Sequence, residues 1–311
     1  MYTLNYQVAP SRKREDNGLP AMAGPDRDAD FLRGRQFDFS RKFLPDGLSM
    51  IHEPGFLNQQ EKRLLSQVQA RSHASLSALL HKFIALKLHD ISHEKRLAGP
   101  AVRQALADFR RDELHLQALY RHAEYLMAKG MPAGYVLLPE VNEVAIVMLE
   151  KCSWAVWAFT CHMQASAQAH YLHSTLPDDE LCGLSRDMFA CHWQVQSRYA
   201  ALAEDEWFVA DRELSATAHE QAVNDLIALL EGMDGMLQAQ ADADAIYFLV
   251  HCGRIFRDEQ AQKVRDVMLK AYRWQFILAG MQEVQFLTAI GGMISGAQGE
   301  RIYRALAPMM G

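Results

Sequence analysis

Residues 100–130 read PAVRQALADFRRDELHLQALYRHAEYLMAKG, and this stretch decides the fold class. Pro100 suits the first turn of a helix, because its missing N–H would have no partner there. Gly130 followed by Pro132 supplies the stop. Between these ends the apolar residues recur with a helical period. The stretch therefore predicts one long helix.

The same period extends to both sides of this helix. We expect three further long helices, from Asn58 to about His93, from Pro139 to about Ser174, and from the acidic Asp178–Glu180 turn to about Ala203. Shorter helices with glycine breaks between them are predicted near residues 213–238, 241–255, 257–279, 281–293 and 298–308. We find no convincing strand. The predicted fold is all-α, an antiparallel four-helix bundle with additional C-terminal helices.

The chain divides into an arm and one large domain. Residues 1–30 are polar and contain several prolines and glycines, so we predict a mobile N-terminal arm. Residues 31–311 are expected to form a single helical domain. Its bundle core is predicted at about residues 57–204 and its helical cap at about 210–310. The 311 residues are enough to bury a substantial core.

Composition excludes several classes of partner. The formal net charge is −6, and no basic block is interleaved with aromatic residues, so we expect no nucleic-acid partner. The apolar runs are too short to span a bilayer, and the N-terminus lacks an apolar signal-peptide core, so no membrane association is expected. Five cysteines are scattered singly, which suits reduced thiols and predicts a cytoplasmic location.

One pair of residues has the spacing of metal ligands. Asp112 and His115 stand at i and i+3 and therefore share a face of the helix at residues 100–130. Dimetal proteins built on helical bundles use a carboxylate and an imidazole at this spacing. The pair is also compatible with an ordinary solvated face. Glu113, the neighbouring acid, should point about 100° away around the helix.

Other polar residues lie in the middles of the remaining long helices. His192, Gln196 and Tyr199 form one stripe, His81 lies in the first long helix, and Gln164 lies in the third. Each of them alone is most simply a polar core residue with its hydrogen bonds satisfied.

Three long spans contain no acidic residue. Asp and Glu are absent from residues 62–89, from 152–176 and from 188–203. These spans form the middles of three of the four predicted long helices. The absence does not depend on how the chain is aligned with any other protein.

Several strings of the chain resemble bacterial ferritin-like proteins related to the carboxylate-bridged di-iron oxygenases, including the p-aminobenzoate N-oxygenase branch. The resemblance covers roughly residues 35–310. The strings that carry it are FDFSRKFLPDGLS (37–49), FLNQQEKRLLSQVQARSHASL (56–76), DELHLQALYRHAEYL (112–126), QAHYL (168–172), CHWQVQSRYA (191–200) and AYRWQFILAGMQEVQFL (271–287).

The resemblance implies a metal site from which most ligands have been replaced. It implies Asp112 and His115 in place of a Glu-x-x-His pair, and His192 in place of a leading histidine. At the positions where the family places other ligands, this chain has His81, Gln164, Gln196 and Tyr199. Related bundles often form homodimers, so a homodimer is expected here.

Charge arithmetic argues against two ions in this core. Two buried divalent cations would be left with too few carboxylates to neutralise them. One divalent ion, iron or zinc, held by His81, Asp112, His115 and His192 is one hypothesis, with an oxygenase or oxidase activity. The preferred hypothesis is a metal-free, hydrogen-bonded core and a non-catalytic binding or accessory protein with a small-molecule or protein partner.

Overall fold

The computed structural model describes residues 32, 34–94, 99–139 and 148–310. The predicted mobile arm at residues 1–30 lies outside these ranges. The helical elements are α2 (Asp46–Ser49), α3 (Gln59–Glu94), α4 (Pro100–Gly130), α6 (Ser153–Ala169), η1 (His170–Thr175), α7 (Gly183–Arg212), α8 (Ala216–His251), α9 (Asp258–Arg273), η2 (Trp274–Leu278), α10 (Ala279–Met281), α11 (Val284–Gly291), α12 (Gly296–Leu306) and η3 (Ala307–Met309).

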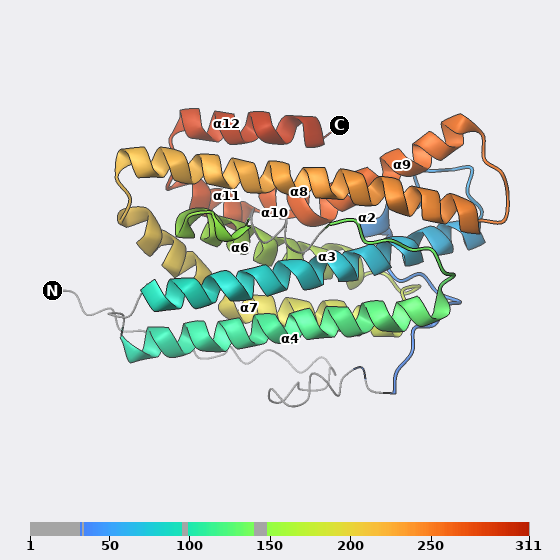
Figure 1. The fold of residues 1–311 in the computed structure, drawn as a ribbon, viewed down its shortest axis with the longest axis horizontal. Helices are drawn as coiled ribbons and strands as arrows, with labels where there is room; N and C mark the ends of the chain where they lie inside the picture. The colour runs from blue at the N-terminus through green and yellow to red at the C-terminus, as the bar shows by residue number, and fades with distance from the viewer. Residues whose placement is uncertain (1–31, 33, 95–98, 140–147, 311) are drawn as a thin grey trace.

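Four long helices, α3, α4, α6 and α7, pack around a shared interior. Helix α3 contacts α4 and α6, and α7 contacts the same two helices. Side-chain bonds show that α3 and α4 run antiparallel, because Arg71 reaches Glu124 while His81 reaches Glu113. Figure 1 shows the long helices lying along one axis. The prediction of an all-α protein is confirmed, since the described residues contain no strand.

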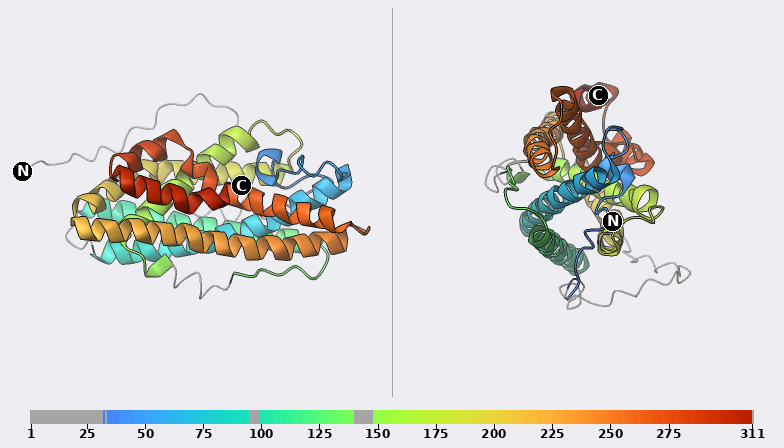
Figure 2. Two further views of the ribbon diagram at one scale, coloured as in Figure 1. Left: turned by 90° about the horizontal axis from the view of Figure 1, so that it is seen from above. Right: turned by 90° about the vertical axis from the view of Figure 1, so that its right-hand side faces the viewer.

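The remaining helices cover one side of this group. Helix α8 lies against α3 and α6, α9 and α12 pack on α8, and α10 and α11 pack on α6. Figure 2 shows α8 and the C-terminal helices gathered away from α4. Met233, Met268 and Met281 point inward and are buried in the core. They therefore contribute to packing between these helices.

Helix α4 begins and ends where the sequence predicts, whereas α6 begins later than predicted. The third long helix was expected to open at Pro139, but residues 150–152 are not helical and α6 begins at Ser153. Residues 140–147 lie outside the described part of the chain. Cys152 has extended backbone angles, and its N–H donates to the Asp225 carboxylate at 3.0 Å. This bond to α8 fixes the start of the helix from outside the local sequence.

The predicted break within residues 213–255 is wrong, because α8 is continuous. Gly232 and Gly235 lie inside it without interrupting it. A glycine in a helix costs only about 1 kcal/mol. The buried face of α8 continues on both sides, with Leu230 and Leu237 fully buried, and its packing exceeds that cost.

Two π-helical segments follow α6 and α9, at η1 and η2. Just beyond η2 the chain passes so close to α6 that a Cβ on Gly280 would overlap the carbonyl oxygen of His162. Only glycine fits there. His162 Nε2 donates to the carbonyl of Ile277 at 2.7 Å, which ties α6 to η2.

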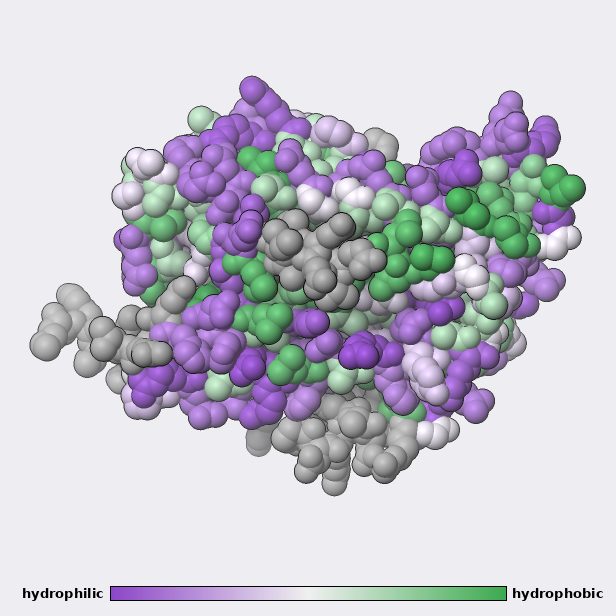
Figure 3. Space-filling model, viewed as in Figure 1, coloured by the Kyte–Doolittle hydropathy of each residue, from purple (hydrophilic) through white to green (hydrophobic). Residues whose placement is uncertain are grey.

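Exposed apolar residues gather where the segment after α4 runs beside α8. The side chain of Gln240 bonds the backbone of Val136 and Leu138, which aligns that segment with α8. Figure 3 shows the apolar residues of this face. The apolar face comprises Val136, Leu137, Leu138, Ile246, Val250 and Ile255. In the described part of the chain, no helix has the length and apolarity that crossing a membrane requires.

Candidate polar core and pocket

A buried carboxylate, Glu113, lies between α3, α4 and α7. Its side chain is fully buried. His81 Nδ1 donates to Glu113 Oε2 at 2.7 Å, and Gln196 Nε2 donates to Oε1 at 2.8 Å. A carboxylate removed from water is costly unless hydrogen bonds replace its hydration. Here each of its two oxygens has a donor, one from α3 and one from α7.

A second pair, Tyr120 and His192, lies further along the same interface. The Tyr120 hydroxyl and His192 Nδ1 share a hydrogen bond of 3.0 Å. The ring of His81 stacks on Tyr120 and meets the ring of His192 edge-on, with centroids 5.6 Å and 5.0 Å away. Burial lowers the pKa of His192 well below its usual value, and nearby imidazoles add to the effect. His192 is therefore neutral at pH 7. We call His81, Glu113, Tyr120, His192 and Gln196 the polar core.

Asp112 belongs to a different cluster. Arg198 Nη1 and Tyr199 Oη both donate to Asp112 Oδ2, at 2.8 Å and 2.7 Å. Arg111 lies 3.6 Å from the other oxygen. Burial, followed by the bond to Asp112, raises the pKa of the Tyr199 hydroxyl, which stays protonated. The carboxylate is thus balanced by guanidinium groups at the edge of the bundle.

The structure does not bring the four expected ligands together. Helices α4 and α7 run antiparallel, so Asp112 meets Tyr199 while Tyr120 meets His192. At 1.5 Å of rise per residue, the seven positions from His192 to Tyr199 separate the two levels by about 10 Å. His115 Nδ1 lies 3.8 Å from Asp112 Oδ1, and its side chain is 31% exposed. Metal binding by any of these side chains stays a prediction.

Glu113, and not its neighbour Asp112, is the carboxylate that contacts His81. A signal for this was present in the sequence. Glu113 continues a stripe with Phe109, Leu116 and Tyr120 at i−4, i+3 and i+7, and these residues are all buried. The metal-ligand spacing of Asp112 and His115 indicated the adjacent face of the helix instead. Glu113 and Tyr120 were therefore not predicted as site residues.

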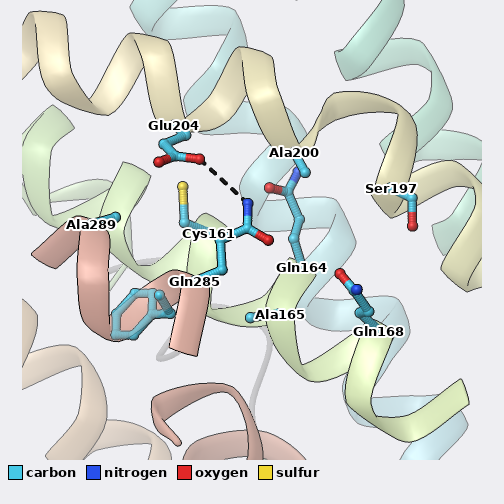
Figure 4. Close-up of a pocket in the computed structure, with 10 residues that line it drawn as sticks. Cys161, Gln164, Ala165, Gln168, Ser197, Ala200, Glu204, Gln285 and Ala289 are labelled. Carbon is cyan, nitrogen blue, oxygen red and sulfur yellow. Dashed lines mark hydrogen bonds between the residues drawn. The ribbon is translucent and has the colours of Figure 1, made fainter. Parts of the chain in front are cut away.

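Gln164 lies apart from the polar core, in a pocket between α6, α7 and α11. Figure 4 shows its side chain extending from α6 toward α7 near Ala200. It is only 5% exposed, yet neither its oxygen nor its nitrogen has a hydrogen-bond partner among the described residues. Buried polar groups are paired in the great majority of cases. Gln164 is therefore an exception that needs an explanation.

His73, on α3, is another buried histidine that sequence reasoning did not select. Gln275 Nε2 donates to the Leu48 carbonyl, so its oxygen faces His73 and accepts from Nδ1 at 2.9 Å. The Nε2 of His73 has no partner in the described residues. Burial lowers the pKa of His73 to about 4. No spacing in the sequence marks this residue, because Gln275 is 202 positions away.

The donor set does not fit a two-metal centre. The polar core holds one carboxylate, and both of its oxygens already accept hydrogen bonds. The nearest other candidate, Asp112, faces guanidinium groups that repel cations. In the described residues, no group of three or more His, Cys, Asp or Glu side chains is arranged to hold a metal ion. What the arrangement does provide is a buried, hydrogen-bonded network.

Comparisons of the chain with protein-family models, curated proteins and solved structures found no match.

Proposed function

We propose that this chain is a ferritin-like, non-catalytic binding or accessory protein whose polar core replaces a di-iron centre. The observation that carries the proposal is the Glu113 carboxylate, held on one side by His81 and on the other by Gln196. Through these contacts, both oxygens of the carboxylate accept hydrogen bonds from side chains of the protein, one from an imidazole and one from a carboxamide. Such a core specifies how α3, α4 and α7 pack without an ion.

The ligand positions of the resembled oxygenases support the same proposal. Gln196 and Tyr199 both donate hydrogen bonds to carboxylates of α4. A glutamine or tyrosine can do this without the desolvation cost of a second buried charge. The substitutions are thus compatible with a bundle that keeps its packing and gives up metal chemistry. The packing of α3, α4, α6 and α7 around one interior is what a ferritin-like bundle would require.

Metal analysis of the purified full-length protein tests the proposal. We expect less than about one-tenth of an equivalent of iron or zinc per chain after expression in metal-supplemented medium, and no rise in Tm when Fe²⁺ or Zn²⁺ is added. About two irons per chain would overturn it in favour of a di-iron enzyme. One tightly bound ion that is lost in His115→Ala would favour the mononuclear oxygenase or oxidase instead.

A second measurement tests the role of the polar core itself. Glu113→Gln keeps the shape of the side chain but removes its charge. If Glu113 is structural, the variant should stay folded and monodisperse, with a change in unfolding free energy of about 1–3 kcal/mol. If Glu113 holds a metal, the variant should lose that metal. The matched variant Asp112→Asn reports on the neighbouring cluster.

We also propose a homodimer, with the apolar face beside α8 as its interface. Val250 and Ile255 are 69% and 98% exposed there, which is unusual for side chains that gain free energy by burial. Light scattering should give the mass of a dimer for the wild type and of a monomer for Val250→Glu with Ile255→Glu. A monomeric wild-type protein would end the homodimer proposal.

A further inference from the structure

The pocket that contains Gln164 is formed by three helices that are distant in sequence. Its cavity volume is only about 30 Å³, and it reaches about 420 Å³ when the space open to solvent is included. A pocket this shallow suits the head group of a small molecule, with the remainder of the molecule at the surface. The lining residues are Cys161, Gln164, Ala165 and Gln168 of α6, Ser197, Ala200 and Glu204 of α7, and Gln285, Phe286 and Ala289 of α11.

Gln164 supplies the specific signal for a ligand. Its carboxamide is an acceptor and a donor of hydrogen bonds, and both functions are unused by the described residues although the side chain is 95% buried. Leaving such groups unpaired costs free energy that a leucine of similar size would avoid. A ligand with a donor beside an acceptor would satisfy both atoms at once.

The rest of the lining restricts the charge of that ligand. Among the described residues that line the pocket, Glu204 is the only charged one, and it accepts a bond of 3.4 Å from Gln285, drawn as a dashed line in Figure 4. A carboxylate or phosphate would be repelled by Glu204, and no lining cation would compensate for it. A neutral head group with N–H donors avoids this repulsion, and unlike a cation such as an amidinium it also offers an acceptor for Gln164 Nε2.

The walls of the pocket provide apolar contact beside the polar groups. Phe286 and Ala289 come from α11, Ala165 from α6 and Ala200 from α7. Phe286 is 3% exposed and so is firmly packed. An apolar body attached to the head group would bury surface against these side chains.

From these observations we infer that the Gln164 pocket binds a small neutral molecule with an amide-type head group, that is, a primary amide, lactam or urea. The amide N–H would donate to Gln164 Oε1 or to Glu204, and its carbonyl would accept from Gln164 Nε2. This inference deepens the proposed binding function and rests on it. Metal analysis tests the polar core on α3, α4 and α7, and the pocket is tested without reference to metal, so the two can fail separately.

Three probes of nearly equal shape test the inference: benzamide, benzoate and benzamidine, titrated into the full-length protein and followed by NMR. Benzamide should bind most tightly, and benzoate most weakly because of Glu204. Gln164→Leu should weaken benzamide by about tenfold, equivalent to about 1.4 kcal/mol, because the hydrogen bonds of the carboxamide are lost. Gln262→Leu, an exposed position on α9 outside the pocket, should leave the affinity unchanged.

A second variant checks the charge argument. Glu204→Gln should raise the affinity for benzoate and so reduce the preference for benzamide. The inference is overturned if benzamide binds no better than benzoate, if none of the probes binds, or if Gln164→Leu binds benzamide as well as the wild type does. Tighter binding of benzamidine than of benzamide would also overturn it, because the site would then select a cation.

Discussion

Two buried glutamines provide a test of how the polar residues of this bundle contribute to stability. Gln164 and Gln196 are 5% and 3% exposed, and both lie in long helices. They differ in hydrogen bonding. Gln196 donates to Glu113 at 2.8 Å, whereas the Gln164 carboxamide has no partner among the described residues. Replacement of each by leucine should therefore change stability in opposite directions.

The expected magnitudes follow from these contacts. Leucine and glutamine have similar volumes and similar helix propensities, so the change in hydrogen bonding dominates. At Gln164 the variant removes an unsatisfied polar group, and the free energy of unfolding should rise by about 1–2 kcal/mol. At Gln196 it removes a bond to a carboxylate and leaves Glu113 Oε1 buried without that donor. The free energy of unfolding should fall by about 2–3 kcal/mol.

Urea denaturation followed by circular dichroism measures both effects, provided that the m value is the same in all three proteins. The two variants should then differ by about 3–5 kcal/mol, which exceeds the error of the extrapolation. A loss of stability in Gln164→Leu comparable to that in Gln196→Leu would refute the reasoning. It would show that the Gln164 carboxamide is satisfied in solution, by ordered water or by a bound molecule that copurifies.

Three further predictions concern pH and close packing. Burial holds the pKa of His162 at about 4, so the stability that its neutral form contributes above pH 6.5 should be lost as the pH falls toward 4. His162→Gln keeps a donor for the Ile277 carbonyl. In this variant the free energy of unfolding measured in urea should therefore change less over that pH range, by up to about 3 kcal/mol. An unchanged pH profile would contradict this. Burial raises the pKa of Asp244 to about 7, so its ionisation opposes folding, and the contribution of this group to stability should fall as the pH rises from about 4 to about 7, opposite in sign to that of His162. Tyr272 donates to Asp244 at 2.5 Å. Tyr272→Phe should therefore lower the free energy of unfolding by about 2 kcal/mol at pH 8, where Asp244 is ionised, and by about 1 kcal/mol at pH 5. Equal losses at the two pH values in urea denaturation would argue against a titrating Asp244. In calorimetry, Gly280→Ala should lower Tm, because the added Cβ would overlap the backbone of His162. Gly235→Ala should raise Tm, because its Cβ would meet no described atom within 4 Å and alanine is the better helix former. A change in Tm of the same sign for both variants would contradict the packing argument.

The ends of helices were predictable only where the local sequence fixes them. Pro100 and Gly130 act through their own backbone, and α4 has these bounds. The start of α6 depends instead on Asp225, 73 residues further along the chain. Gly232 and Gly235 looked like breaks, but the packing of α8 keeps them helical. For the start of α6 and for the continuity of α8, contacts between distant segments outweigh the local signal, which for a glycine in a helix is only about 1 kcal/mol.

The candidate site shows the same division. The sequence identified Gln164, His192, Gln196 and Tyr199 as interior positions, and all of them are buried. It did not identify their partners. Asp112 and Glu113 are adjacent, and the choice of the one that reaches His81 depends on the rotation of α4 between its neighbours.

The sequence by itself therefore determined that this protein is built of long helices, because helical hydrogen bonds join residues four positions apart. The absence of acids from three spans was equally a property of the sequence. The tertiary structure alone decided that Glu113 is bonded by His81 and Gln196, and that Gln164 has no hydrogen-bond partner among the residues the structure describes. Gln196 is 83 residues from Glu113. Contacts over such separations depend on the way whole helices pack, and no local spacing in the sequence encodes them.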